Sequence, residues 1–152
     1  MSEALILNQL KENIGKEIGL SEWMEITQSR INAFADCTED RQWIHVNEEM
    51  AKHSPFGTTI AHSFLILSLL SYFNFQNKLF RSGIKMAANY GLNRVRFINS
   101  VPVGSRIRNR AVLKEITEKG PGRILINLEN TVEIEGQEKP AMKAEMLAML
   151  FV

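Results

Sequence analysis

The stretch IAHSFLILSLLSYFNF, residues 60–75, decides the fold, because its apolar residues fall all around a helical wheel. A helix with that pattern is buried on nearly every side. It is too short to span a bilayer, which requires about 20 apolar residues. We therefore expect a long central core helix that the rest of the chain must cover.

The second half of the chain is expected to form the strands that cover this helix. In residues 123–136, RILINLENTVEIEG, apolar and polar residues alternate, which predicts a strand with one buried face. Further strands are expected at the following ranges: 21–26, 89–98, 106–117 and 139–152. The turns VPVG, at 101–104, and KGPG, at 119–122, join their neighbours. These elements predict an α+β fold, in which an antiparallel curled β-sheet is wrapped around the central helix.

The first half reads mostly as helices. A short helix is expected over residues 5–11, followed by a turn-rich stretch between Gly15 and Gly19. Thr27 is a candidate N-cap for a helix whose apolar stripe includes Ile31 and Ala35, and Asn47 is one for a second helix.

Length and composition favour one domain, residues 1–152, of an ordinary globular protein. The net charge is +1, and no basic run points to nucleic acid or a membrane surface as a partner. The single cysteine, Cys37, reads as a small core residue in a reducing compartment. The N-terminus does not read as a signal peptide, so a cytoplasmic protein is expected.

No motif for a metal or a cofactor stands out. His45, His53 and His62 do not have the spacing of a zinc site, and phosphate-binding loops and nucleophile elbows are missing from the sequence. We expect neither a metal nor a bound cofactor. Three arginines alternate along one predicted strand at positions 106, 108 and 110, which is typical of a solvated face and leaves an anionic ligand as the alternative.

Asp40 and His45, in ADCTEDRQWIHVN at residues 35–47, form the candidate chemical pair. Five residues separate them, whereas neighbours on a helix face lie three or four apart, so the chain must leave helical geometry if they meet. Spacing alone leaves open a loop aspartate that caps a backbone N–H beside a surface histidine. An apolar setting, with Trp43 and Ile44 between the two, would favour proton transfer near neutral pH.

FADCTEDRQWIHVN followed by FGTTIAHSFLILSLLS resembles the hydratase motif of the MaoC-like, (R)-specific enoyl-CoA hydratase family. The commoner motif runs A-x-x-T-x-D-x-N-P-x-H and then F-G-x-x-I-A-H-G. The matching residues are Phe34, Ala35, Thr38, Asp40, His45, Phe56, Gly57, Ile60, Ala61 and His62. The opening residues resemble a subgroup described as nodulation-protein-N-like. The resemblance covers most of residues 14–152 and implies a hot-dog fold.

The resemblance also implies roles. Asp40 and His45 match a catalytic dyad that holds a water and adds it to a trans-2-enoyl thioester, giving an (R)-3-hydroxyacyl thioester. The backbone N–H of Ser63 matches the donor to the thioester oxygen, and such a donor stabilises developing enolate charge. Ser71 matches a serine that orients the dyad or its water, although its hydroxyl can equally bond the preceding helical turn. His62 reads as a buried imidazole that ties the loop to the helix.

Three positions depart from the family pattern. Ser63 replaces the usual glycine, which adds bulk and a hydroxyl where the thioester approaches. Gln42 and Trp43 replace asparagine and proline in the turn that carries the dyad.

The resemblance implies a hydro-lyase that acts on acyl-CoA as its substrate and forms a homodimer. Two alternatives stay open, namely an acyl-CoA thioesterase of the same fold and a non-catalytic dimeric acyl-binding protein.

Overall fold

A computed structural model describes residues 1–81 and 83–152. The elements, in chain order, are α1 (Glu3–Glu12), β1 (Glu17–Leu20), β2 (Met24–Glu25), α2 (Gln28–Thr38), α3 (Trp43–Val46), α4 (Glu48–Lys52), α5 (Ser63–Ser68), α6 (Leu70–Phe75), the 3-10 helix η1 (Lys78–Phe80), β3 (Met86–Phe97), β4 (Arg106–Glu118), β5 (Arg123–Ile134) and β6 (Met142–Phe151).

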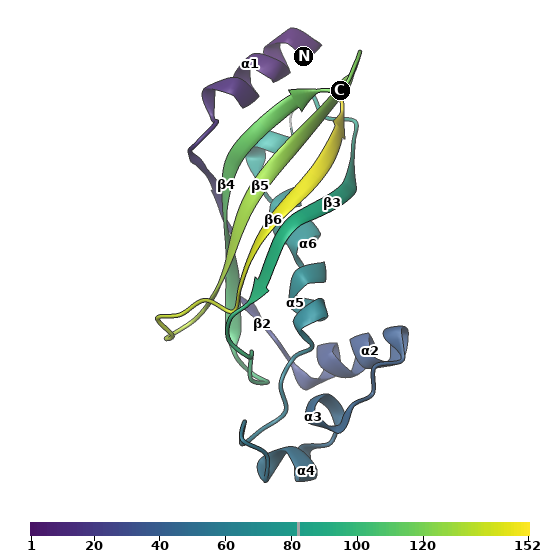
Figure 1. Ribbon diagram of the computed structural model, residues 1–152, viewed down its shortest axis with the longest axis vertical. Coiled ribbons are helices and arrows are strands. Elements are labelled where there is room, and N and C mark those ends of the chain that lie inside the picture. Colours follow the sequence, from purple (N-terminus) through teal and green to yellow (C-terminus); the bar gives the residue numbers. More distant parts are fainter. Residues whose placement is uncertain (82) are drawn as a thin grey trace.

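The strands form one six-stranded antiparallel sheet in the order β1-β4-β5-β6-β3, and β2 pairs with β4. The sheet curves around α5 and α6, which lie along its concave face (Figure 1). Every second residue of β5 is buried, from Ile124 to Ile134, because period-two alternation puts its apolar side chains toward the helices. The expected α+β hot-dog fold is confirmed.

The central helix is shorter than residues 60–75 and consists of two segments, α5 and α6, that meet at Leu69. Leu69 keeps right-handed helical angles, and backbone hydrogen bonds of 3.1 Å from Leu69 to Leu65 and 3.0 Å from Phe73 to Leu69 span the junction. The two segments therefore follow each other as a continuous rod against the sheet.

Burial of this rod is one-sided, and the expectation of burial on nearly every side is wrong for the single chain. Leu65, Ile66, Leu70 and Phe73 are at most 5% exposed and join the core. On the other side, large apolar side chains face solvent: Phe64 is 66% exposed, Tyr72 is 52% exposed and Phe75 is 51% exposed. The all-round apolar pattern thus combines a core stripe with an uncovered surface stripe.

The turn expected at residues 101–104 connects two strands that are not neighbours. β3 pairs with β6, so β5 and β6 lie between β3 and β4 in the sheet. The connection binds the segment that leads into α5: Ala61 N–H donates to Val101 O at 2.8 Å, and Val103 N–H donates to Thr59 O at 2.9 Å. A β-bridge between Ile60 and Pro102 lies between these two bonds, so the segment is held like a short extra strand.

The N-terminal half confirms some predictions and corrects others. Thr27 and Asn47 cap α2 and α4 through side-chain oxygens, as expected. The stretch expected as a turn after Gly15 instead contains β1, which pairs with β4. Cys37 is exposed and is not a core residue, because it lies on the solvent side of α2.

The three alternating arginines lie on the outer face of the sheet and pair with carboxylates. Arg106 contacts Glu135 at 3.1 Å, and Arg108 contacts Glu133 at 2.6 Å. Arg110 bonds Glu133 and Glu17, and the Arg108 guanidinium lies 4.4 Å from the centre of the Trp23 ring. This row supports the interpretation as a solvated face, since its charges are already balanced within the sheet.

Among the helices of residues 1–81 and 83–152, none has the length and apolar character that a membrane crossing requires.

Candidate active site

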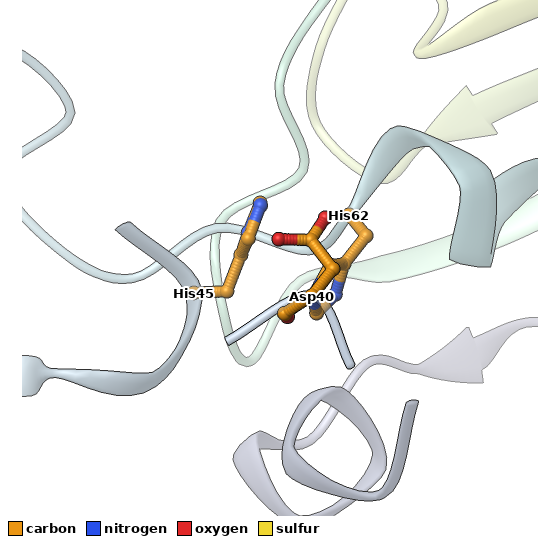
Figure 2. Close-up of side chains that lie close together, drawn as sticks. All are labelled: Asp40, His45 and His62. Carbon is orange, nitrogen blue, oxygen red and sulfur yellow. The ribbon is translucent and has the colours of Figure 1, made fainter. Parts of the chain in front are cut away.

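Three polar side chains converge where the segment between α2 and α3 meets the start of α5. Figure 2 shows Asp40, His45 and His62 close together. Each offers one oxygen or nitrogen atom, and these atoms all lie within 4.8 Å of one another. The fold thus brings together the predicted pair, Asp40 and His45, and adds His62 to it.

The chain reaches this geometry through a sharp turn after α2. Glu39 is the C-cap of α2 and has φ of 66°, a left-handed conformation that is uncommon for residues other than glycine. Arg41 forms ion pairs with Glu39 and Asp36, which hold the turn from the solvent side. Asp40 Oδ1 accepts a hydrogen bond from Gln42 N–H at 3.4 Å. The chain therefore turns at residues 39–42, which takes it out of helical geometry between α2 and α3.

His45 lies on α3 and is 6% exposed. Its Nδ1 is 2.7 Å from the carbonyl oxygen of Ile60. A carbonyl can only accept, so Nδ1 carries the proton of the neutral ring and Nε2 holds a free lone pair. Burial lowers the pKa of His45, and the nearby His62 ring lowers it further, although the Ile60 carbonyl and the Asp40 charge act in the opposite direction. The neutral, basic form of His45 is therefore favoured.

His62, the N-cap residue of α5, is 2% exposed and acts as a brace. Its Nε2 donates to the backbone carbonyl of Asp40 at 2.8 Å. This bond fixes the position of the Asp40 backbone relative to the start of α5. Its ring stacks on His45 at 3.8 Å and contacts Phe34 at 4.9 Å between centroids. These contacts support the interpretation of His62 as the imidazole that ties the loop to the helix.

The cluster has the chemical groups of either a water site or a metal site. One carboxylate and two imidazoles can bind Zn²⁺, whose N and O ligands lie about 2.0–2.2 Å from the ion and so no more than about 4.4 Å apart. A water held by hydrogen bonds of about 2.8 Å bridges atoms up to about 5.6 Å apart. The atoms of the cluster lie within 4.8 Å of one another, which is inside the range of one bridging water.

Gln28 and Thr59 hold the site together, and the sequence reading did not identify them. Gln28 Nε2 donates to the backbone carbonyl of His45 at 2.8 Å, and Gln28 Oε1 accepts from Thr59 Oγ1 at 2.5 Å. Thr59 is fully buried. Polar residues at the start of a helix and in a loop carry no periodic signal, so only the fold shows that they meet.

The two predicted serines lie in different places. Ser63 is exposed and is the first residue of α5, so its N–H has no partner within the helix and is available next to His62. Ser71 lies eight residues further along, about 12 Å at the helical rise of 1.5 Å per residue. Its Oγ donates to Asn89 Oδ1 on β3 at 3.2 Å. Ser63 thus follows His62 of the cluster directly in the chain, whereas Ser71 bonds to β3.

Comparison with known proteins identifies a matching family model and several similar sequences. Residues 9–136 match a family model described as MaoC like domain. The chain is 48% identical over 134 residues to 3-hydroxyacyl-thioester dehydratase Z of Mycobacterium tuberculosis, covering 88% of this chain and 87% of that protein. It is 46% identical over 147 residues to Nodulation protein N of Rhizobium leguminosarum bv. viciae, covering 96% and 91%.

Among solved structures, the fold is similar to that of an (R)-hydratase from A. caviae involved in PHA biosynthesis. The TM-score is 0.72 at 21% identity, and the match covers 88% of this chain and 95% of that one. At this level of identity the likeness shows the fold alone.

The Gln28–Thr59 bond leads to a stability prediction. Replacing Thr59 by the isosteric valine leaves Gln28 Oε1 without its buried donor, and we expect a loss of about 1–3 kcal/mol in the free energy of unfolding. Thr58→Val, at the neighbouring and less buried position, is the control and should change it by about 0.5 kcal/mol or less. Urea denaturation followed by circular dichroism measures both. Equal losses in the two variants would contradict the bracing role of this bond.

Proposed function

The chain belongs to the MaoC-like dehydratase family, a family of hydro-lyases, and we propose that it interconverts trans-2-enoyl-CoA and (R)-3-hydroxyacyl-CoA. The observation that carries the proposal is the convergence of Asp40 and His45 beside the start of α5, with Nδ1 of His45 bonded to Ile60 so that Nε2 is left free. This arrangement supplies a base, a carboxylate and a backbone donor in one place, which hydration of a conjugated thioester requires.

In the hydration direction, a water lies between Asp40 and His45. His45 Nε2 takes a proton from the water as its oxygen bonds to C3 of the substrate. The electron pair of the 2,3 double bond moves toward the thioester oxygen and gives an enolate. When the enolate collapses, the dyad returns the proton to C2, so that both residues regain their starting states. Dehydration follows the same steps in reverse.

The enolate oxygen is the group that Ser63 N–H stabilises in this mechanism. A backbone donor does not depend on the side chain, so serine in place of the usual glycine preserves it. The side chain of Ser63 is exposed, which leaves room for its hydroxyl to turn away from an approaching thioester.

We further propose that the protein is a homodimer. β3 is an edge strand, and an uncovered edge of this length is a site for pairing with another chain. It exposes apolar side chains, including Tyr90 at 60% and Leu92 at 46%. The Phe97 ring contacts Phe64 edge-on at 5.9 Å, which joins the edge to the uncovered stripe of the central helix. A second copy would cover both features at once.

Substitutions in the dyad provide the main test. Asp40→Asn and His45→Gln should each lower kcat for hydration of enoyl-CoA by about 100-fold or more, because each removes a proton-transfer group. Loss of the ultraviolet absorbance of the conjugated enoyl thioester measures the rate, and dialysis against a chelator should leave it unchanged.

Glu48→Gln and His53→Gln are the matched controls, since both side chains lie exposed outside the cluster, and both should retain the parent rate. If the protein turns over none of a series of enoyl-CoAs of increasing chain length, the proposal is refuted. Release of free thiol from acyl-CoA would instead identify a thioesterase, and binding of acyl-CoA without either reaction would identify an acyl-binding protein.

The lowered pKa of His45 sets the pH dependence. The base is active when neutral, that is, above its pKa, and burial moves that pKa below the usual value of about 6.5. Hydration should therefore be near its maximum at pH 7, and kcat/KM should fall on acidification with a midpoint below 6.5. An acid limb centred at or above 6.5 would show that His45 is not the buried base.

The dimer is tested at the edge strand. Leu92→Arg places a charge in the proposed interface and should convert the protein to a monomer in analytical ultracentrifugation. Leu20→Arg is the matched control, because Leu20 is 44% exposed and lies on β1 at the opposite side of the sheet. If Leu92→Arg leaves the oligomeric state unchanged, β3 is not the interface.

A further inference from the structure

Three asparagines are buried in the core between α6 and the sheet. Asn74 of α6 is 5% exposed, Asn109 of β4 is 2% exposed, and Asn130 of β5 is fully buried. Buried amides are costly unless their hydrogen-bonding groups are satisfied. An amide cluster at this depth therefore raises the question of what each nitrogen and oxygen binds.

The backbone fixes which way these amides face. Asn130 Nδ2 donates to the carbonyls of Leu128 at 3.0 Å and Ala144 at 3.4 Å, so its Oδ1 must face Asn109. Asn109 Nδ2 then donates to Asn130 Oδ1 at 2.9 Å and to Asn74 Oδ1 at 3.2 Å. A carbonyl cannot donate, so reversing any amide would break this chain of bonds. Because its Oδ1 faces Asn109, Asn74 must direct its NH₂ group away from Asn109, at the end of this chain of hydrogen bonds.

That NH₂ group is poorly satisfied. Within the described part of the chain, its hydrogen-bond contact is the sulfur of Met146 at 4.0 Å, and a thioether is a weak acceptor. Asn74 and Met146 also line a cavity of ≈ 20 Å³, whose other walls include Ala87, Leu128 and Ala148. This volume accommodates one oxygen atom the size of a water. A buried donor thus faces a small, mainly apolar cavity, and the other two polar side chains on it, Ser71 and Asn89, bond each other at 3.2 Å.

A resident water fits this cavity less well than part of a ligand does. Buried waters usually make about three hydrogen bonds, whereas the walls beside Asn74 are mainly aliphatic. An oxygen atom carried on a ligand chain would occupy this volume and satisfy the amide, while the rest of the chain would lie outside the cavity. Ser71, which matches the family serine expected to orient the dyad or its water, lies on the same cavity, one helical turn before Asn74.

We propose that Asn74 is a specificity-determining residue that donates a hydrogen bond to an oxygen on the acyl chain of the substrate. The substrate class is then an acyl thioester with a ketone or another acceptor oxygen on its distal part. This inference rests on the proposed hydratase activity.

The test uses matched pairs of trans-2-enoyl-CoAs of increasing chain length, one member unsubstituted and the other with a ketone at the penultimate carbon. At the length that reaches Asn74, we expect kcat/KM for the ketone member to exceed that of its partner by about tenfold. Asn74→Leu should abolish or reverse this preference while it retains hydration of the unsubstituted chains. Asn74→Ser has a shorter polar side chain that does not reach the oxygen of the substrate, so it should also lose the preference. This variant provides the test if Asn74→Leu does not fold.

Phe73→Leu is the packing control, because Phe73 is a core residue of the same helix that does not line this cavity. It should lower the thermal midpoint and leave the ketone preference intact. Equal kcat/KM values for both members at every length, or an unchanged ratio in both Asn74 variants, would overturn the inference and leave the hydratase proposal standing. Absence of turnover with every pair would overturn both.

Discussion

One buried hydrogen bond, from His45 Nδ1 to the carbonyl of Ile60, joins the two halves of the site. Ile60 N–H donates to Ile44 O at 3.1 Å in return, so the two segments hold each other by reciprocal bonds. The same carbonyl sets the tautomer of His45 and hence the side of the ring that is basic. The position of the dyad, its protonation state and its alignment with α5 therefore all depend on the backbone of one residue, Ile60.

Asp40 and His45 differ in their environments, and this difference separates their roles. His45 is almost fully buried, whereas Asp40 is exposed at the end of a left-handed turn. Burial penalises the charged imidazolium, and solvent exposure keeps the carboxylate hydrated. A substrate that covers Asp40 would remove that hydration and bring both groups into a single dry space. The site is thus open on the aspartate side and closed on the histidine side.

Much of this architecture could be predicted from periodicity. The alternation in β5 and the caps Thr27 and Asn47 were predicted correctly because each reflects a local physical rule. The exposed stripe of Phe64 and Tyr72 was mistaken for core, since the pattern records apolar character but not what covers it. The pairing of β3 with β6 and the bracing by Gln28 depend on long-range contacts, for which the sequence carries no periodic signal. In the candidate site, the Asp40–His45 pair could be expected from motif resemblance, whereas the left-handed Glu39 could not.

The hydrogen bonds between Val101–Val103 and Thr59–Ala61 have a consequence for the order of folding. The dyad segment is made early during synthesis, yet part of its support comes from the connection between β3 and β4, and β3 is fixed in the sheet when it pairs with β6. Local hairpins such as β4–β5 close with little loss of chain entropy, whereas β3–β6 pairing joins distant parts of the chain. We therefore expect the reactive geometry to be among the last features to form during folding, so that activity reports completion of the whole sheet.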